Sequence, residues 1–143
     1  MKTKNLENFR LLSSIIIIIG GFLPWFIFSS SIRPNIIGYE LPYGFITTIV
    51  GIFCVPIIYD KMNEQKERKF SNYIIISLSL VCLFCIMVMI SIFSEVLQNE
   101  IVLGYGAWLS MGGSILLALT SLLIIYINSN RISDARTGNK VID

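Results

Sequence analysis

The sequence contains no histidine and few charged residues. Charged side chains make up only 14% of its 143 residues, whereas a soluble domain of this size has about 25%. Without histidine the chain lacks the commonest general base, the commonest metal ligand and the usual pH switch near neutrality. The formal net charge is +2, which excludes the concentrated basic surface typical of nucleic-acid binding.

Cysteine is also scarce. Three cysteines make an odd number and predict no disulfide framework. Cys82 and Cys85 form a C-x-x-C, which in a soluble redox fold indicates thiol–disulfide chemistry. Four-helix membrane thiol oxidoreductases resemble this chain in helix number, but they use more than one cysteine pair near the aqueous face. Here the pair lies deep in an apolar run and only Cys54 remains, so we interpret all three as packing residues.

Long hydrophobic runs dominate what is present. Hydrophobic residues make up 55% of the chain and the mean hydropathy is +0.75. A bilayer core about 30 Å thick needs roughly 20 apolar residues in a helix, and continuous runs of this length favour helices over barrel strands. We therefore predict an all-α, four-transmembrane-helix bundle that forms a single integral-membrane domain of residues 1–143 in the cell membrane. The uncharged runs cover residues 11–28, 41–59, 73–93 and 101–127, and a polar tail covers 128–143.

The distribution of Lys and Arg predicts the orientation of the bundle. Ten of the eleven lie in the N-terminal segment, the middle loop or the C-terminal tail, and Arg33 alone lies on the other side. Because cytoplasmic loops carry the excess of Lys and Arg, we expect both termini in the cytoplasm. The first run could instead be a signal peptide, but it is longer than the usual 7–15 residues and no A-x-A-like site follows it.

A weak internal repeat relates the second and fourth runs. The pattern Y-G-x-x-x-[ST]-x-x-G occurs twice at a constant offset of 62 residues. Because both runs would enter from the outside, the pattern indicates two parallel hairpin repeats. Coincidence among small residues is the alternative. The matched residues are Tyr43, Gly44, Thr48 and Gly51 in one copy and Tyr105, Gly106, Ser110 and Gly113 in the other.

Small residues recur every four positions in the fourth run. They form a ridge on one helix face, and such a ridge lets a neighbouring helix approach closely in lipid. The second run offers Gly44 with Thr48, or Thr47 with Gly51, as a counterpart. We expect packing within the chain, or alternatively docking to another subunit. The ridge consists of Gly106, Ser110, Ser114 and Ala118.

The remaining motifs indicate anchoring rather than chemistry. Trp25 and Trp108 both fall near the predicted outer boundary, where tryptophan commonly anchors a helix at the interface, so we expect two interfacial anchors. The glycine-rich segment 104–113 lacks the lysine that a phosphate loop needs. We identify no catalytic residues, no metal ligands and no cofactor.

Two motifs carry a resemblance. An LPW at 23–25 ends the first run, and YGAWLSMGG at 105–113 opens the fourth. This pattern resembles small uncharacterised four-helix membrane proteins of prokaryotes, and the resemblance implies the fold but no activity. The layout is also similar to claudin-type tetraspan proteins, although this chain lacks their outer-loop cysteine pair and long first loop.

Three functions are compatible with these features. The first is a non-enzymatic multi-pass membrane protein, an accessory or assembly subunit that packs laterally against another membrane protein or itself. The second is a small channel or carrier for a neutral or hydrophobic solute, supported by the hydroxyl residues of the runs and by Pro56 within the second run. The third is an immunity protein against a membrane-active toxin. The lipid bilayer is the common partner of all three.

Overall fold

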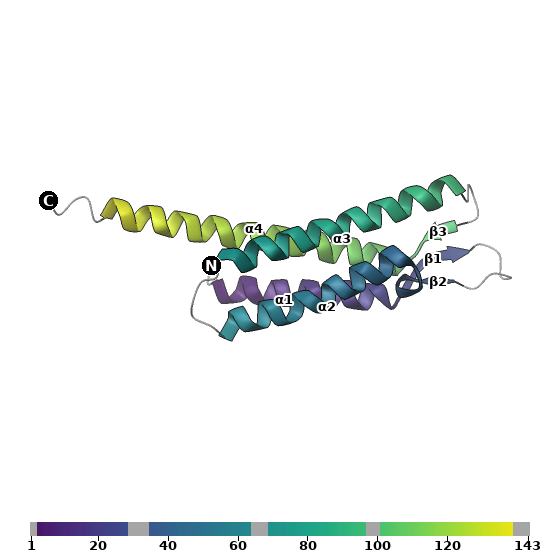
Figure 1. Cartoon of the computed structure of the whole chain (residues 1–143), viewed down its shortest axis with the longest axis horizontal. Coiled ribbons are helices and arrows are strands. Elements are labelled where there is room, and N and C mark those ends of the chain that lie inside the picture. Colours follow the sequence, from purple (N-terminus) through teal and green to yellow (C-terminus); the bar gives the residue numbers. More distant parts are fainter. Residues whose placement is uncertain (1–2, 29–34, 64–68, 97–100, 139–143) are drawn as a thin grey trace.

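The computed structural model describes residues 3–28, 35–63, 69–96 and 101–138. Within these residues four long helices run up and down in an elongated bundle (Figure 1). They are α1 (Thr3–Gly21), α2 (Pro42–Asn63), α3 (Lys69–Val96) and α4 (Tyr105–Gly138). α1 lies between α2 and α4, and α3 lies between the same two helices on the other side.

Three helices are long and apolar enough to cross a membrane. The candidate spans are Pro42–Asp60, Phe70–Ile92 and Tyr105–Asn130, within a few residues of the predicted second, third and fourth runs. The prediction of helices long and apolar enough to cross a membrane is confirmed for these three. α1 is not among them, because the helix begins at Thr3 and includes Lys4, Glu7 and Arg10.

The first predicted span is wrong as a continuous helix. α1 ends at Gly21, and Pro24–Phe28 forms strand β1. Two consecutive glycines favour a helix end, and proline disfavours the helical region for the residue before it. The following Trp-Phe-Ile-Phe is rich in the aromatic and β-branched residues that suit strands.

A small antiparallel sheet joins the two connections at one end of the bundle (Figure 1). β1 is the central strand, with β2 (Ile36–Ile37) on one side and β3 (Ile101–Leu103) on the other. Phe26 pairs with Leu103 and Phe28 with Ile101. A 3-10 turn, η1 (Gly38–Glu40), then leads into α2. The all-α prediction therefore missed a sheet, and residues 101–103 belong to β3 rather than to the fourth helix.

The opposite end of the bundle holds the starts of α1 and α3 and the end of α2 (Figure 1). α4 continues past the other helices at this end, up to Gly138. Residues 128–138 of the predicted polar tail are therefore helical. Of the basic residues used for orientation, Lys2, Arg33, Lys66, Arg68 and Lys140 lie outside the described residues.

The core consists of two apolar clusters along the bundle axis. One lies in the middle and includes Ile17, Cys54, Cys82 and Leu117. The other lies beneath the sheet and includes Trp25, Phe26, Ile86 and Ala107. All four helices contribute to these clusters, so the bundle and the sheet pack as one domain.

Candidate functional site: a glycine-packed seam and a buried ion pair

Backbone contact joins α1 to α4 along a seam formed by Gly20, Gly106, Ser110 and Gly113. A Cβ added to Gly106 would lie 2.6 Å from the carbonyl oxygens of Gly20 and Leu23, and one added to Gly113 would lie 2.9 Å from Ile17 Cγ1. Real Cβ atoms essentially never show contacts this short. The two backbones therefore approach as closely as they do only because these positions carry no side chain.

The seam includes two of the four residues of the predicted ridge of α4, Gly106 and Ser110. Ser110 and Ser114 are fully buried together with Gly106, while Ala118 is only half-buried. The counterpart of Gly106 and Ser110 is α1, not the second run, which the sequence offered. The ridge therefore packs inside the chain in this structure, and the short distances involve glycines of α1 that the spacing in α4 did not identify.

The residues of the second run that were predicted to contact the ridge of α4 lie against α1 and η1 instead. Thr48 of α2 lies against Gly21 of α1, where an added Cβ would collide with the threonine side chain. Gly51 lies against Ile17 and Ile18, also of α1. Gly44 packs on the backbone of Gly38 in η1. α1 is therefore the helix that both predicted surfaces contact.

Trp25 is a core residue rather than an interfacial anchor. Its side chain is 1% exposed, and its Nε1 donates a hydrogen bond to the carbonyl oxygen of Gly20 at 3.0 Å. A Cβ on Gly106 would lie 2.7 Å from the ring atom Cδ1, so the seam leaves room for the indole. The prediction of an interfacial anchor at Trp25 is therefore wrong. Trp108 is 56% exposed and has the exposure that an anchor requires.

The hydroxyl groups inside the bundle bond mostly to their own helices. Thr47 and Thr48 both donate to the carbonyl oxygen of Gly44 at 2.8 Å. This is the usual arrangement of serine and threonine in membrane helices, where the freed side-chain donor is satisfied locally. The same bond to a carbonyl three or four residues earlier is made by Ser13, Ser14, Ser79, Ser114, Thr120 and Ser121.

The three cysteines lie in the interior and none forms a disulfide. Cys54 and Cys82 belong to the central apolar cluster. The Cys82 thiol points to the carbonyl oxygen of Thr47 at 3.9 Å, a weak contact between α3 and α2. Their surroundings are those of small apolar core residues, which fits the predicted packing role.

A buried polar cluster lies at the other end of α1. Arg10 is 0% exposed, and Glu7 and Asn72 are also buried. Arg10 Nη1 donates to Glu7 Oε2 at 2.8 Å and to Asn72 Oδ1 at 3.1 Å. Because Asn72 belongs to the first turn of α3, this cluster connects two helices that are diagonal in the bundle. Sequence reasoning placed Arg10 outside the lipid as a topology signal and did not find its partners.

The guanidinium of Arg10 is only partly satisfied. Its Nε and Nη2 atoms are buried and have no hydrogen-bond partner in the described part of the chain. An arginine keeps its charge even when buried, and each unsatisfied buried donor costs about 1–3 kcal/mol or more for a charged group. The two unsatisfied donors therefore destabilise the fold if the cluster serves only as a structural contact.

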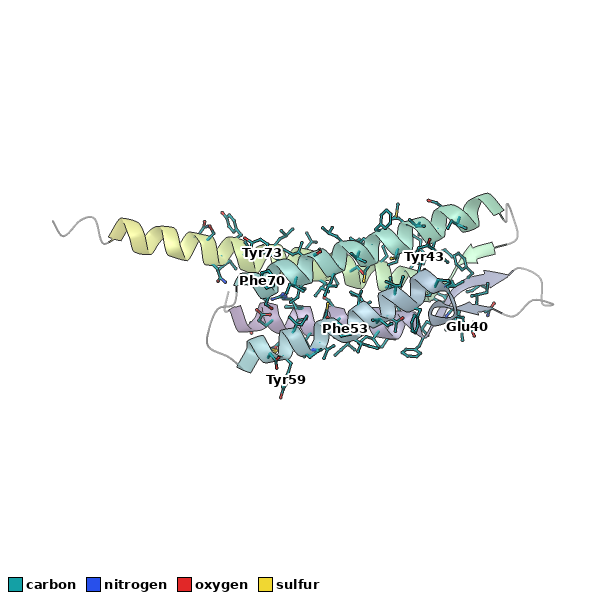
Figure 2. All side chains as sticks on the ribbon, viewed as in Figure 1. Glu40, Tyr43, Phe53, Tyr59, Phe70 and Tyr73 are labelled. Atoms are coloured by element: carbon teal, nitrogen blue, oxygen red, sulfur yellow. The ribbon has the colours of Figure 1, made fainter. Side chains whose placement is uncertain are left out.

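The outer surface of the bundle is apolar along the helices. Phe53 and Phe84 are exposed in the middle, and Figure 2 places Tyr59, Phe70 and Tyr73 toward the end remote from the sheet. Gly112 of α4 lies on this surface, half-buried, and an added Cβ would meet no atom within 4 Å. At each of the other eight glycines between residues 20 and 113, an added Cβ would lie 3.0 Å or less from another atom.

Comparisons with protein-family models, with curated proteins and with solved structures gave no match. Within the described residues, no group of three or more His, Cys, Asp or Glu could hold a metal ion. The resemblance to small four-helix membrane proteins of prokaryotes stays a prediction.

Proposed function

We propose that this chain is a four-pass protein of the cell membrane, with α1 as the fourth crossing and both termini in the cytoplasm. The 19 residues of α1 measure about 28 Å at 1.5 Å per residue. Its buried Glu7 and Arg10 are shielded from lipid by the neighbouring helices, as charged residues within membranes generally are. The excess of Lys and Arg at the end without the sheet supports this orientation.

Within the membrane we assign the chain a non-enzymatic role as an accessory or assembly subunit that packs laterally against another membrane protein or against itself. The observation that carries this role is Gly112. It is a small residue on the lipid-facing side of α4 whose space the chain itself does not fill. Small residues at such positions let a second helix approach closely, because association in lipid depends on van der Waals contact.

The surroundings of Gly112 form a shape that a helix can enter. Trp108 and Leu116 lie one turn before and after it, and Leu109 and Ile115 flank it at three-residue spacing; all four are exposed. The glycine is thus a gap in a row of large apolar side chains. The ridge predicted from sequence is occupied inside the chain, so Gly112 replaces it as the support for lateral docking.

Replacing Gly112 with leucine tests this role. Because an added Cβ at this position meets nothing in the chain, Gly112→Leu should fold normally and lose lateral association. Association is measured in lipid by chemical cross-linking and by quantitative co-purification in mild detergent. Ser77→Leu is the matched control, since Ser77 is exposed on α3 and the change places the same leucine side chain elsewhere on the surface. Equal association of both variants and the wild type would contradict the proposal.

The channel alternative has less support. Most of the hydroxyl groups that would line a path donate to carbonyls of their own helices, which leaves them poorly placed to receive a solute. Ser110 Oγ is buried and has no partner in the described part of the chain. Flux in liposomes that contain only this chain would favour the alternative, and its absence together with loss of association in Gly112→Leu would favour the subunit. An immunity role against a membrane-active toxin is the third function proposed from sequence.

A further inference from the structure

The unpartnered edge of the Arg10 guanidinium is the feature that the proposed function leaves without a role. Nη1 is occupied by Glu7 and Asn72, whereas Nε and Nη2 have no acceptor among the described residues. These two nitrogens form one edge of the planar group. Parallel N–H bonds from one edge of an arginine match the paired oxygens of a phosphate or carboxylate.

The first turn of α3 reaches the same guanidinium at Nη1 and adds further donors near it. Asn72 contacts Arg10 directly, and it is the fourth residue of a 28-residue helix that begins at Lys69. The first four backbone N–H groups of a helix have no partner within it, and the helix dipole favours a negative group there. In the same turn, Ser71 Oγ is buried and has no partner in the described part of the chain.

The location of the cluster favours a particular oxyanion. It lies toward the end of the bundle where α1 and α3 begin, away from the sheet (Figure 1), close to Phe70, where the candidate span of α3 starts. This is the depth of lipid headgroups for a helix that crosses the bilayer. Phosphate is the anionic group most abundant at that depth, and its three oxygens can accept from both guanidinium nitrogens.

We propose that Arg10, through its Nε and Nη2 atoms, binds a phosphate group at the N-terminal turn of α3. The bound group supplies the acceptors that the buried guanidinium otherwise lacks, and Glu7 on Nη1 holds the side chain in place for it. The phosphate comes from a lipid headgroup or from free phosphate, which share this chemistry. Binding would connect α1 to α3 and is independent of lateral docking at Gly112.

Native mass spectrometry of the full chain in dodecyl maltoside tests the proposal. Three probes are added separately: phosphatidylglycerol, inorganic phosphate, and a diacyl glycolipid without phosphate. The wild type should retain phosphatidylglycerol or phosphate at least about tenfold better than the glycolipid, because charge-assisted hydrogen bonds are the strong ones. Retention of phosphatidylglycerol alone identifies the headgroup as the source, and retention of inorganic phosphate alone identifies the free anion.

Two variants assign the binding to this edge. Arg10→Lys keeps the charge but removes the paired donors, and Asn72→Asp keeps an acceptor for Nη1 while adding a negative charge beside the site. Each should weaken retention about tenfold, and Ser77→Ala, on the exposed side of α3, should leave it unchanged. If circular dichroism shows that Arg10→Lys does not fold, the retention of phosphate by Asn72→Asp tests the proposal. Wild-type retention in the folded variants, or no preference for phosphate in the wild type, would overturn the proposal.

Discussion

The two ends of α1 are held in the bundle by opposite kinds of contact. Near the sheet, Gly20 and Gly21 bring the helix backbone against α4 and α2. At the other end, Arg10 reaches Asn72 of α3 with a long charged side chain. The first contact is steric, and it forms only because glycine has no Cβ atom that would keep the two backbones apart. The second is directional and carries a desolvation cost, so the same helix should respond to mutation in two different ways.

Removal of Arg10 should have the largest effect. Arg10→Leu leaves buried Glu7 without its arginine partner, and loss of one member of a buried pair typically costs about 3–5 kcal/mol. The free energy of unfolding is measured by denaturant titration in mixed micelles. The double variant with Glu7→Gln should recover part of the loss because it also removes the charge. A single variant as stable as the wild type would show that the polar end does not hold α1.

The glycine end should respond to one methyl group. Gly106→Ala places a Cβ 2.6 Å from two backbone carbonyl oxygens, and such overpacking typically costs about 1–3 kcal/mol. Gly112→Ala is the control on the same helix, since its Cβ meets nothing, and alanine should stabilise that helix by about 0.5–1 kcal/mol. The same titration measures both variants. Equal changes in stability would mean that close approach of α1 does not depend on the seam.

The smallest effect concerns the two tryptophans. Trp25→Phe keeps a buried ring but removes the bond to the Gly20 carbonyl oxygen, at a cost of about 0.5–1.5 kcal/mol. Trp108→Phe, on the exposed surface, should change stability little. Brominated lipids give an independent measurement, because they should quench Trp108 in the Trp25→Phe variant and leave Trp25 fluorescent in Trp108→Phe. Strong quenching of Trp25 would place it at the lipid boundary after all.

The helices α2, α3 and α4 could be predicted closely because their apolar runs are long and uncharged. β1 could not, since Trp-Phe-Ile-Phe extends the first run and a short apolar segment has the same composition in a strand as in a buried helix. Pro24, which follows two glycines closely, was the available signal of a helix end. β3 was missed for the same reason, because residues 101–103 are apolar and continue directly into the fourth run.

The site was predicted in part. The four-residue spacing of Gly106, Ser110 and Ser114 indicates a packing surface, but spacing within one helix does not say which helix covers it. Arg10 was missed for a related reason, because a basic residue beside an apolar run is usually a topology signal. The pairing of Glu7 and Arg10 at i,i+3 was visible in the sequence. That Asn72 completes the cluster depends on tertiary structure.

The pairing of α1 with α4 and of β1 with β3 has a consequence for biosynthesis. α1 contacts α4 more extensively than it contacts α2, although α4 is synthesised after α2 and α3. β1 likewise gains its second partner only when residues 101–103 have been made. Until then the glycine face of α1 and the ring of Trp25 have no α4 to cover them. Folding of the chain should therefore pass through an intermediate of α1, α2 and α3 in which the end that carries the sheet is still uncovered, and this end closes only after α4 has been made.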